Sequence, residues 1–293
     1  MERTLLVMDS GPVSCAVMSR PPYLETALET ALKAADAAGA IIRKAYRGKF
    51  KLRYKADASP VTDVDEAAEA EIRKILKKKF HGHGFYGEET GFDRGASRPG
   101  GGKDRADAEY LWLVDPIDGT KAFVRGYPIF SVQIALMHRG ELVLGVSHAP
   151  CWNDGKGETL HAGKGHGAWH GAERLQVSNV ARIEKATLST CNLATLADSS
   201  GWARLGALIP RLHRIRGYGD FLHYHYLAGG HLDAVIESDV NILDIAALAV
   251  IVREAGGTVT DLAGRPVGLG TTSVLASNGL LHKSLQSALA HGS

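Results

Sequence analysis

The stretch Trp112–Thr120, WLVDPIDGT, ends an apolar run with two aspartates, a proline, a glycine and a threonine. The apolar half predicts a buried strand, because short hydrophobic runs bounded by turn residues are typical of one. The acidic half has two interpretations: Asp, Pro and Gly are favoured in turns, whereas two carboxylates and an intervening carbonyl are the oxygen ligands that Mg²⁺ binds. An EF-hand is excluded, because its ligands alternate along a twelve-residue loop that ends in glutamate.

Length and composition limit the partners that this chain is expected to have. Its 293 residues suit one large domain or two lobes, and 45% hydrophobic with 23% charged residues is typical of a soluble globular protein. The net charge of +2 favours neither nucleic acid nor an anionic membrane as the main partner. Cys15, Cys151 and Cys191 are too far apart for a metal or redox motif. We therefore expect free thiols in the cytoplasm, and no segment is long enough to span a membrane.

Periodicity predicts alternating helices and strands. Apolar residues recur at helical spacing from Leu24 to Tyr46, and Thr62 with Asp65 three residues later predicts a capped second helix. Further helices are expected at 219–229 and 244–255, the latter ending at Gly256. Strands are expected at 110–115, 129–138, 142–148, 186–190, 213–217, 232–237, 257–260 and 273–276. This interleaving predicts a layered α/β fold, with a tail at 1–20, a first lobe at 21–150 and a second at 151–293.

Acidic residues recur where predicted elements begin or end. They are Asp63, Glu88, Asp244 and the pair Asp115 and Asp118. Each has an ordinary explanation as well, because Asp63 suits a helix dipole, Asp244 suits a helix cap and Glu88 suits a solvated loop. Separate element ends can also bring carboxylates together around a metal ion without burying them unpaired.

Four stretches together resemble the inositol monophosphatase superfamily. They are GEE at 87–89, WLVDPIDGT at 112–120, LDIAA at 243–247 and EAGG at 254–257. Within that superfamily, SSGWARLGAL at 199–208 and RIRGYGDFLHYHYLAGG at 214–230 are similar to bacterial histidinol-phosphate phosphatases. The resemblance implies a layered αβαβα fold and a Mg²⁺-dependent phosphatase that Li⁺ inhibits and in which Mn²⁺ can replace Mg²⁺. It also implies a homodimer.

The resemblance also implies residue roles. It makes Glu88, Asp115 and the carbonyl of Ile117 ligands of one Mg²⁺, Asp118 and Asp244 ligands of a second that Asp115 bridges, and Glu88 a ligand of a third, weaker ion. Thr120 with Asp63 would orient the attacking water, and N–H groups of Gly119 and Thr120 would receive phosphate, as helix starts do. One position departs from the family: Leu243 stands where a tryptophan usually precedes the last ligand, so we expect looser packing there.

Asp220 and Glu237 are the residues expected to select the substrate. Two carboxylates favour a cationic leaving group, and histidinol carries an amine and an imidazole; the alternative is that Asp220 only caps a helix. His223 and His225 are expected in the core or at a subunit contact. The sequence thus predicts a histidinol-phosphate phosphatase, with an inositol phosphatase or another small sugar or nucleotide phosphatase as the alternative. A regulatory RNA-associated role is disfavoured by the intact ligand set and by the absence of a basic run.

Overall fold

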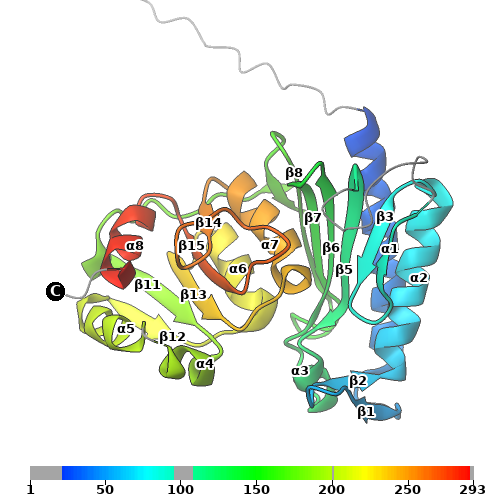
Figure 1. Cartoon of the computed structure of the whole chain (residues 1–293), viewed down its shortest axis with the longest axis horizontal. Coiled ribbons are helices and arrows are strands. Elements are labelled where there is room, and N and C mark those ends of the chain that lie inside the picture. The colour runs from blue at the N-terminus through cyan, green and yellow to red at the C-terminus, as the bar shows by residue number, and fades with distance from the viewer. Residues whose placement is uncertain (1–21, 96–107, 200, 291–293) are drawn as a thin grey trace, which may run out of the picture.

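The computed structural model describes residues 22–95, 108–199 and 201–290, and the tail expected at 1–20 lies outside them. Two sheets alternate with three layers of helices (Figure 1). This arrangement is the αβαβα fold that the sequence predicted. Within the described residues, no helix combines the length and apolar character needed to cross a membrane.

Helices α1 (Pro22–Ala45) and α2 (Asp63–Lys79) form the first layer (Figure 1). The apolar stripe of α1 predicted from Leu24 to Ile42 is buried against the first sheet and α2. At Gly39 the helix approaches the sheet so closely that a Cβ atom would lie 2.4 Å from the His148 ring. The predicted cap of α2 is confirmed, because Thr62 and Asp65 form a capping box.

The first sheet has eight strands in the order β10-β9-β8-β7-β6-β5-β3-β4. Its central strands are apolar on both faces because helices cover both. In chain order the strands are β3 (Gly84–Gly87), β4 (Gly91–Asp93), β5 (Tyr110–Asp118), β6 (Ser131–His138), β7 (Glu141–Ala149), β8 (Glu158–Gly163), β9 (Ala168–His170) and β10 (Glu173–Arg174). A separate hairpin joins β1 (Leu52–Tyr54) to β2 (Pro60–Thr62).

The division between the two sheets falls later than the lobe boundary expected at residue 150. Pro150 lies in the turn between β7 and β8, which are antiparallel neighbours in one sheet. The first strand of the second sheet, β11, begins only at Thr187. A boundary at 150 would therefore cut a hairpin, and the physical division lies between Arg174 and Thr187.

The middle layer consists of α6 (Asp220–Ala228) and α7 (Ile242–Glu254), which are buried between the sheets. Ala255 is the C-cap of α7, and Gly256 follows with φ 96°, at the position where the sequence predicted the helix to end. The second sheet has the order β12-β11-β13-β15-β14. Its strands are β11 (Thr187–Thr190), β12 (Arg214–Arg216), β13 (Ala234–Ser238), β14 (Thr258–Thr260) and β15 (Ser273–Ser277).

The outer layer covers the far face of the second sheet (Figure 1). It contains α4 (Leu193–Asp198), α5 (Trp202–Leu208) and α8 (His282–Ala290). Two single turns, Ile183–Lys185 and Ile209–Arg211, lie in the connections, and the short helix α3 (Thr120–Val124) directly follows β5. The end of β5, the end of β13 and the starts of α6 and α7 all contribute to one cavity between the two sheets.

Candidate metal centre

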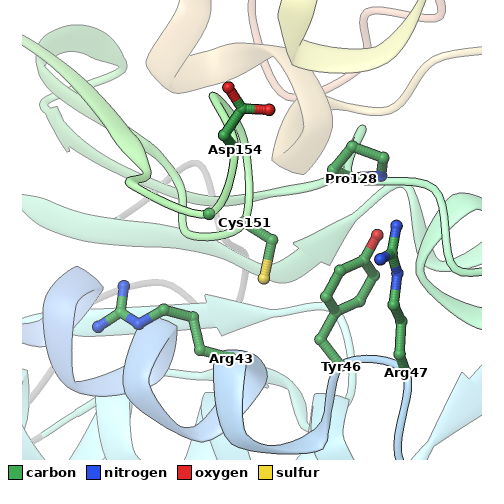
Figure 2. Close-up of a pocket in the computed structure, with 7 residues that line it drawn as sticks. Arg43, Tyr46, Arg47, Pro128, Cys151 and Asp154 are labelled. Atoms are coloured by element: carbon green, nitrogen blue, oxygen red, sulfur yellow. The ribbon is translucent and has the colours of Figure 1, made fainter.

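A wide pocket of about 540 Å³ lies between the end of α1 and the β7–β8 turn (Figure 2). Arg43, Arg47 and Cys151 are among its lining residues. Burial raises the pKa of the Cys151 thiol, so the sulfur is protonated and a poor nucleophile. Arg43 is already 3.5 Å from the carboxylate of Asp36. The pocket contains none of the residues that the sequence singled out for chemistry.

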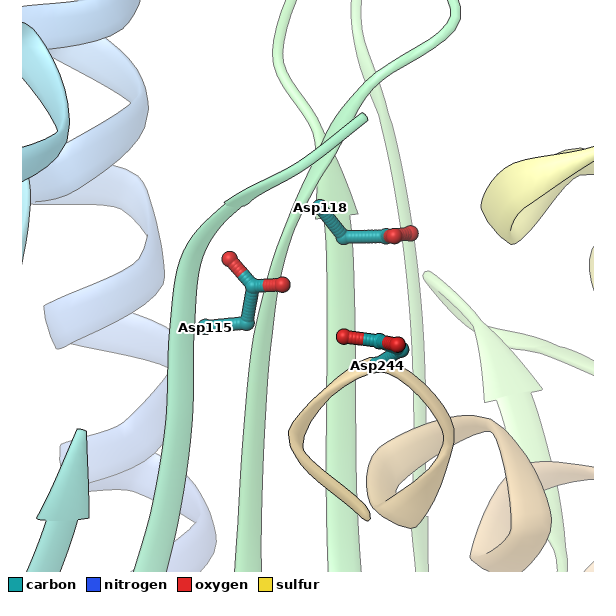
Figure 3. A group of neighbouring side chains, drawn as sticks. All are labelled: Asp115, Asp118 and Asp244. Carbon is teal, nitrogen blue, oxygen red and sulfur yellow. The ribbon is translucent and has the colours of Figure 1, made fainter. Parts of the chain in front are cut away.

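Asp115, Asp118 and Asp244 form a separate cluster at the end of β5 and the start of α7 (Figure 3). One carboxylate oxygen of each lies within 4.8 Å of the others. Among the described residues, this is the group of Asp, Glu, His and Cys side chains whose ligand atoms lie close enough together to hold one metal ion. All three belong to the ligand set predicted from the resemblance.

An irregularity in β5 brings the first two carboxylates together. In a regular strand, side chains three residues apart point to opposite faces. The register of β5 with β6 shifts between Asp115 and Asp118, and the backbone N–H of Ile117 donates to Asp115 Oδ1 at 2.9 Å. The local bend therefore re-aims the strand end, as bulges beside active sites do.

Asp244 is fixed by the first turn of α7. Asn241 is the cap of that helix, and its backbone N–H and side-chain Nδ2 donate to the two oxygens of Asp244 at 2.9 and 2.8 Å. Asp244 is therefore the third residue of a capping box and not the cap itself. Leu243, at the position where the resemblance leads one to expect a tryptophan, is buried, with only 3% exposed; the looser packing expected there stays a prediction.

The electrostatics of the cluster favour a bound cation. Burial, together with the charges of neighbouring carboxylates, raises the pKa values of Asp115 and Asp118 well above their ordinary range. Burial and the charges of Glu88 and Glu237 raise the pKa of Asp244 to about 7, although Asn241 donates to it. Buried like charges are costly unless a counter-charge is present. An all-oxygen donor set of this kind fits a hard divalent cation such as Mg²⁺.

Glu88 lies in the β3–β4 turn, close enough to Asp115 that its charge helps to raise the pKa of that carboxyl group. Its backbone N–H donates to the Val114 carbonyl at 3.2 Å, which ties the turn to β5. Lys55 Nζ donates to Glu88 Oε1 at 2.8 Å and thereby offsets one negative charge. Sequence reasoning did not single out Lys55, which lies outside the motifs that carry the resemblance.

The GEET turn is held by Glu69, a fully buried carboxylate on α2. It accepts hydrogen bonds from the backbone N–H groups of Glu89 and Thr90 at 2.8 and 2.9 Å. A Cβ atom at Gly87 would lie 2.5 Å from this carboxylate, so glycine is required there. The apolar stripe of α2 gave no sign of this buried acid, which positions Glu88.

Thr120 pairs with Asp65 and not with Asp63, which corrects the prediction. Thr120 Oγ1 lies 3.3 Å from Asp65 Oδ1 and 3.0 Å from the Ile117 carbonyl. Asp63 is exposed, and among the described residues its carboxylate accepts a hydrogen bond from the Lys51 N–H at 3.0 Å. Residues two apart on a helix point in different directions, so only Asp65 faces the cluster.

Gly119 and Thr120 begin α3 immediately after the clustered carboxylates. Gly119 has φ 92°, and a Cβ there would lie 2.8 Å from the Ile129 carbonyl oxygen. A side chain is therefore excluded by both conformation and space. The turn aims the start of α3 beside Asp118, where the first N–H groups of a helix are free of intrahelical partners.

Asp220 and Glu237 line the same cavity of about 60 Å³ as Asp118 and Asp244. Asp220 is the first residue of α6 and has φ 45°. The N-cap of the helix is Gly219, so no side chain caps it. Burial raises the pKa of Asp220 to about 6, although His223 opposes this. The alternative that Asp220 is the cap of α6 is therefore wrong.

Glu237 is held by Tyr224 of α6 and lies close to His223, whose Nε2 makes no hydrogen bond to a described residue. Tyr224 Oη donates to Glu237 Oε2 at 2.8 Å, and His223 Nε2 lies 3.3 Å from the same oxygen. Neither contact uses Oε1, and the carboxylate lines the cavity. His223 and His225 are buried, as predicted for core residues, and Tyr224 is a further cavity residue that sequence reasoning left in the core.

Comparison with known proteins agrees with this geometry. Residues 23–292 match the model of the inositol monophosphatase family. A histidinol-phosphatase of Mycobacterium tuberculosis is 39% identical over 90% of this chain and 98% of its own length. A fructose-1,6-bisphosphatase/inositol-1-monophosphatase of Thermotoga maritima is 37% identical over 76% of this chain and 79% of its own. The structure of the extragenic suppressor protein suhB from Bartonella henselae, 30% identical, superposes with a TM-score of 0.79 over 92% of this chain and all of its own.

Proposed function

The chain belongs to the inositol monophosphatase family, and from this premise we propose that it is a Mg²⁺-dependent phosphatase that hydrolyses L-histidinol phosphate to L-histidinol and phosphate in histidine biosynthesis. The observation that carries the proposal is one cavity that joins the metal-type carboxylates Asp118 and Asp244 to two further carboxylates, Asp220 and Glu237. The first pair suits metal-assisted hydrolysis, and the second suits a positively charged leaving group.

We assign the metal to Glu88, Asp115, Asp118, Asp244 and the Ile117 carbonyl. When bound, Mg²⁺ supplies a water of lowered pKa and stabilises charge on the leaving oxygen. Two or three ions are expected, with Mn²⁺ as a substitute and Li⁺ as an inhibitor. The carboxylates keep the site from becoming strongly cationic, so that a phosphate dianion can enter and leave.

Asp65 and Thr120 are proposed to orient the attacking water. Asp65 accepts from the Thr62 N–H at 2.8 Å and from Thr62 Oγ1 at 2.5 Å, and it lies 3.3 Å from Thr120 Oγ1. When the Thr120 hydroxyl donates its proton to this fixed carboxylate, the lone pairs of Thr120 Oγ1 are left to accept a hydrogen bond from the attacking water. The N–H groups of Gly119 and Thr120 are proposed to receive the phosphate oxygens.

Asp220 and Glu237 are proposed to bind the cationic part of the substrate. The ammonium and imidazole of histidinol can pair with these carboxylates, whereas a neutral polyol offers only hydroxyl donors. Glu237 is pre-oriented by Tyr224, which lowers the entropy lost on binding. The name of the Mycobacterium tuberculosis relative supports the same substrate.

The second candidate is inositol monophosphate. Its support is the Tyr224 hydroxyl and the Asn192 amide, which also line the cavity and can bind a polyol. The Thermotoga maritima relative carries that activity in its name.

A panel of phosphate esters, with released phosphate as readout, tests these alternatives. We expect kcat/KM for L-histidinol phosphate to exceed that for inositol 1-phosphate at least about tenfold, since one charge-assisted hydrogen bond is worth about 1.5–3 kcal/mol. A preference for inositol phosphate would refute the substrate, and full activity in excess EDTA would refute the metal.

We further propose a cytoplasmic homodimer that takes a small phosphorylated metabolite and neither nucleic acid nor membrane. The near-neutral charge of +2 supports the expectation about nucleic acid and membrane, and the free thiols of Cys151 and Cys191 support the cytoplasm. The homodimer is what the resemblance to the family implies. Light scattering of the purified protein tests the oligomeric state.

A further inference from the structure

A line of polar side chains leads from Asp118 through the interior of the first sheet to Glu158, the first residue of β8. Ser131 Oγ lies 3.5 Å from Asp118 Oδ2, and Gln133 Nε2 lies 2.7 Å from Ser131 Oγ and 3.1 Å from Ser147 Oγ. His225 completes the line, with Nε2 at 2.8 Å from Ser147 Oγ and Nδ1 at 2.6 Å from Glu158 Oε1. We name this set the Ser131–Glu158 network; its members are Ser131, Gln133, Ser147, His225 and Glu158.

The network is built into otherwise apolar strands. Ser131 and Gln133 alternate along β6, and Gln133 pairs with Ser147 of β7 in the sheet register. Both strands are otherwise almost wholly apolar in their buried parts. Buried hydroxyl and amide groups cost stability unless they are hydrogen-bonded. Apolar residues would pack this interface more cheaply, so stability alone does not account for the polar line.

The charge of Glu158, at one end of the network, decides which atom donates in each hydrogen bond. An ionised carboxylate only accepts, so His225 Nδ1 carries a proton. Burial lowers the pKa of His225 despite the nearby carboxylate, so the ring is neutral and Nε2 must accept from the Ser147 hydroxyl. Ser147 Oγ then accepts from one Gln133 N–H.

The other end of the network is fixed by the amide of Gln133. Its second N–H donates to Ser131 Oγ, which leaves the single Ser131 proton for Asp118 Oδ2. If the Gln133 amide were turned the other way, the Ser147 hydroxyl would donate its proton to Gln133 Oε1. His225 Nε2, which carries no proton, would then face a Ser147 oxygen with no proton left to donate. The observed orientation leaves Gln133 Oε1 without a partner among the described residues, and both N–H groups are used.

We propose that the Ser131–Glu158 network is a positioning device that holds Asp118 in the orientation that binds Mg²⁺ and secures α6 against the same strands. The inference rests on the proposed Mg²⁺-dependent hydrolase. A carboxylate with one oxygen hydrogen-bonded has fewer orientations to lose when the ion binds. His225 is five residues along α6 from Asp220, so the same bonds join the metal centre to the helix that begins with a substrate-binding residue.

Two single substitutions at opposite ends test the network. Ser131→Ala removes the side-chain group that contacts Asp118, and Glu158→Leu changes a side chain at the start of β8 that is 20% exposed. We expect Mg²⁺ affinity, measured by calorimetry on metal-free protein, to fall about tenfold in Ser131→Ala, since substituting groups behind a ligand typically costs 10–100-fold. Glu158→Leu should weaken it several-fold, and Ser131→Thr, which keeps the hydroxyl, should restore it.

Matched controls separate positioning from packing. His148 is another buried histidine; it lies on β7 with its ring against α1, is bonded to Thr159 at 2.7 Å and is not part of the network. His148→Asn and Thr159→Val should therefore lower the melting temperature without changing Mg²⁺ affinity. In a Gln133→Met background, Glu158→Leu should have no further effect on Mg²⁺ affinity, because the link is already broken.

The outcomes distinguish this inference from the proposed function. Wild-type Mg²⁺ affinity in both Ser131→Ala and Glu158→Leu would overturn the network, while the hydrolase would stand. Equal losses in the His148→Asn control would also overturn it, because they would reflect general destabilisation. Absence of Mg²⁺ binding by the wild type would refute the proposed function and the network with it.

Discussion

Asp63 and Asp65 provide a matched pair for testing how the attacking water is oriented. Both lie in the first turn of α2, but only Asp65 contacts Thr120. Asp65→Asn keeps one carbonyl oxygen for the cap and removes the charge that holds the Thr120 proton. General acid–base contributions are typically 10²–10⁴-fold, so we expect kcat to fall by about that factor, or about 3–5 kcal/mol in the barrier.

The structural cost of the same change is much smaller. Asp65 accepts from Thr62 within the capping box, and loss of such a cap typically costs about 1 kcal/mol. Asp65→Asn should therefore remain folded, as judged by circular dichroism and the melting temperature. Asp63→Asn should stay within about twofold of wild-type kcat, because its side chain is exposed and still accepts from Lys51.

The assay is phosphate release from L-histidinol phosphate at saturating Mg²⁺. Thr120→Ser, which keeps the hydroxyl, should retain much of the activity, and Thr120→Val should lose about as much as Asp65→Asn. The double variant Asp65→Asn with Thr120→Val should be little worse than either single variant, since both belong to one unit. A large loss in Asp63→Asn with near wild-type turnover in Asp65→Asn would refute the reasoning.

Three further predictions follow from the site and its surroundings. Asp220→Asn should reduce the kcat/KM preference for L-histidinol phosphate over inositol 1-phosphate about tenfold or more, while turnover of p-nitrophenyl phosphate stays nearly unchanged. Asp239→Asn is the matched control and should leave the preference as it is, because both aspartates have a positive φ that asparagine also tolerates. Equal loss on all substrates would make Asp220 structural. Asp118→Asn should lower kcat by several orders of magnitude in folded protein, since a ligand charge is lost; near wild-type turnover would contradict the metal assignment. Burial lowers the pKa of His148 to about 4, so between pH 4 and 6.5 the unfolded chain binds more protons at this residue than the folded chain, and the contribution of His148 to the free energy of unfolding rises with pH. His148→Asn should therefore make the free energy of unfolding, measured with denaturant, rise less steeply with pH in that window; an unchanged pH dependence would refute this.

The elements that were predicted from the sequence are strongly periodic or bounded by turn residues. The stripe of α1, the apolar run of β5 and the glycine after α7 each appear where the sequence placed them. The short strands β8 to β10 were not predicted, since two to six residues at a sheet edge carry little periodic signal. Missing them moved the expected boundary to Pro150, into the middle of a hairpin.

The site was predictable in its composition and less so in its orientation. The motif around Asp115 and Asp118 identified the cluster, but two acids at one helix start cannot be told apart by motif alone. The capping box did contain the missing signal, because Thr62 with Asp65 three residues later places Asp65 on the inner side of the turn. Combining the cap with the metal motif would have selected Asp65. Long-range partners such as Glu69 carry no comparable signal, because their role depends on chain segments that meet only in the folded protein.

Several features that a plain turn or core does not need occur at this site. The irregularity in β5, the positive φ of Gly119 and of Asp220, and the raised pKa values of the clustered aspartates all occur around one cavity. The positive φ of Asp220 and the burial of neighbouring carboxylates cost stability that the surrounding layers must offset. If the end of WLVDPIDGT served only as a turn, the glycine and the proline would be enough. If it served only as part of the core, none of the carboxylates would be needed. A divalent cation accounts for the remaining features together, because it removes the repulsion among the acids that the strand irregularity and the start of α7 bring within reach of one another. The acidic end of WLVDPIDGT is therefore better explained as the anchor of a metal centre than as a turn.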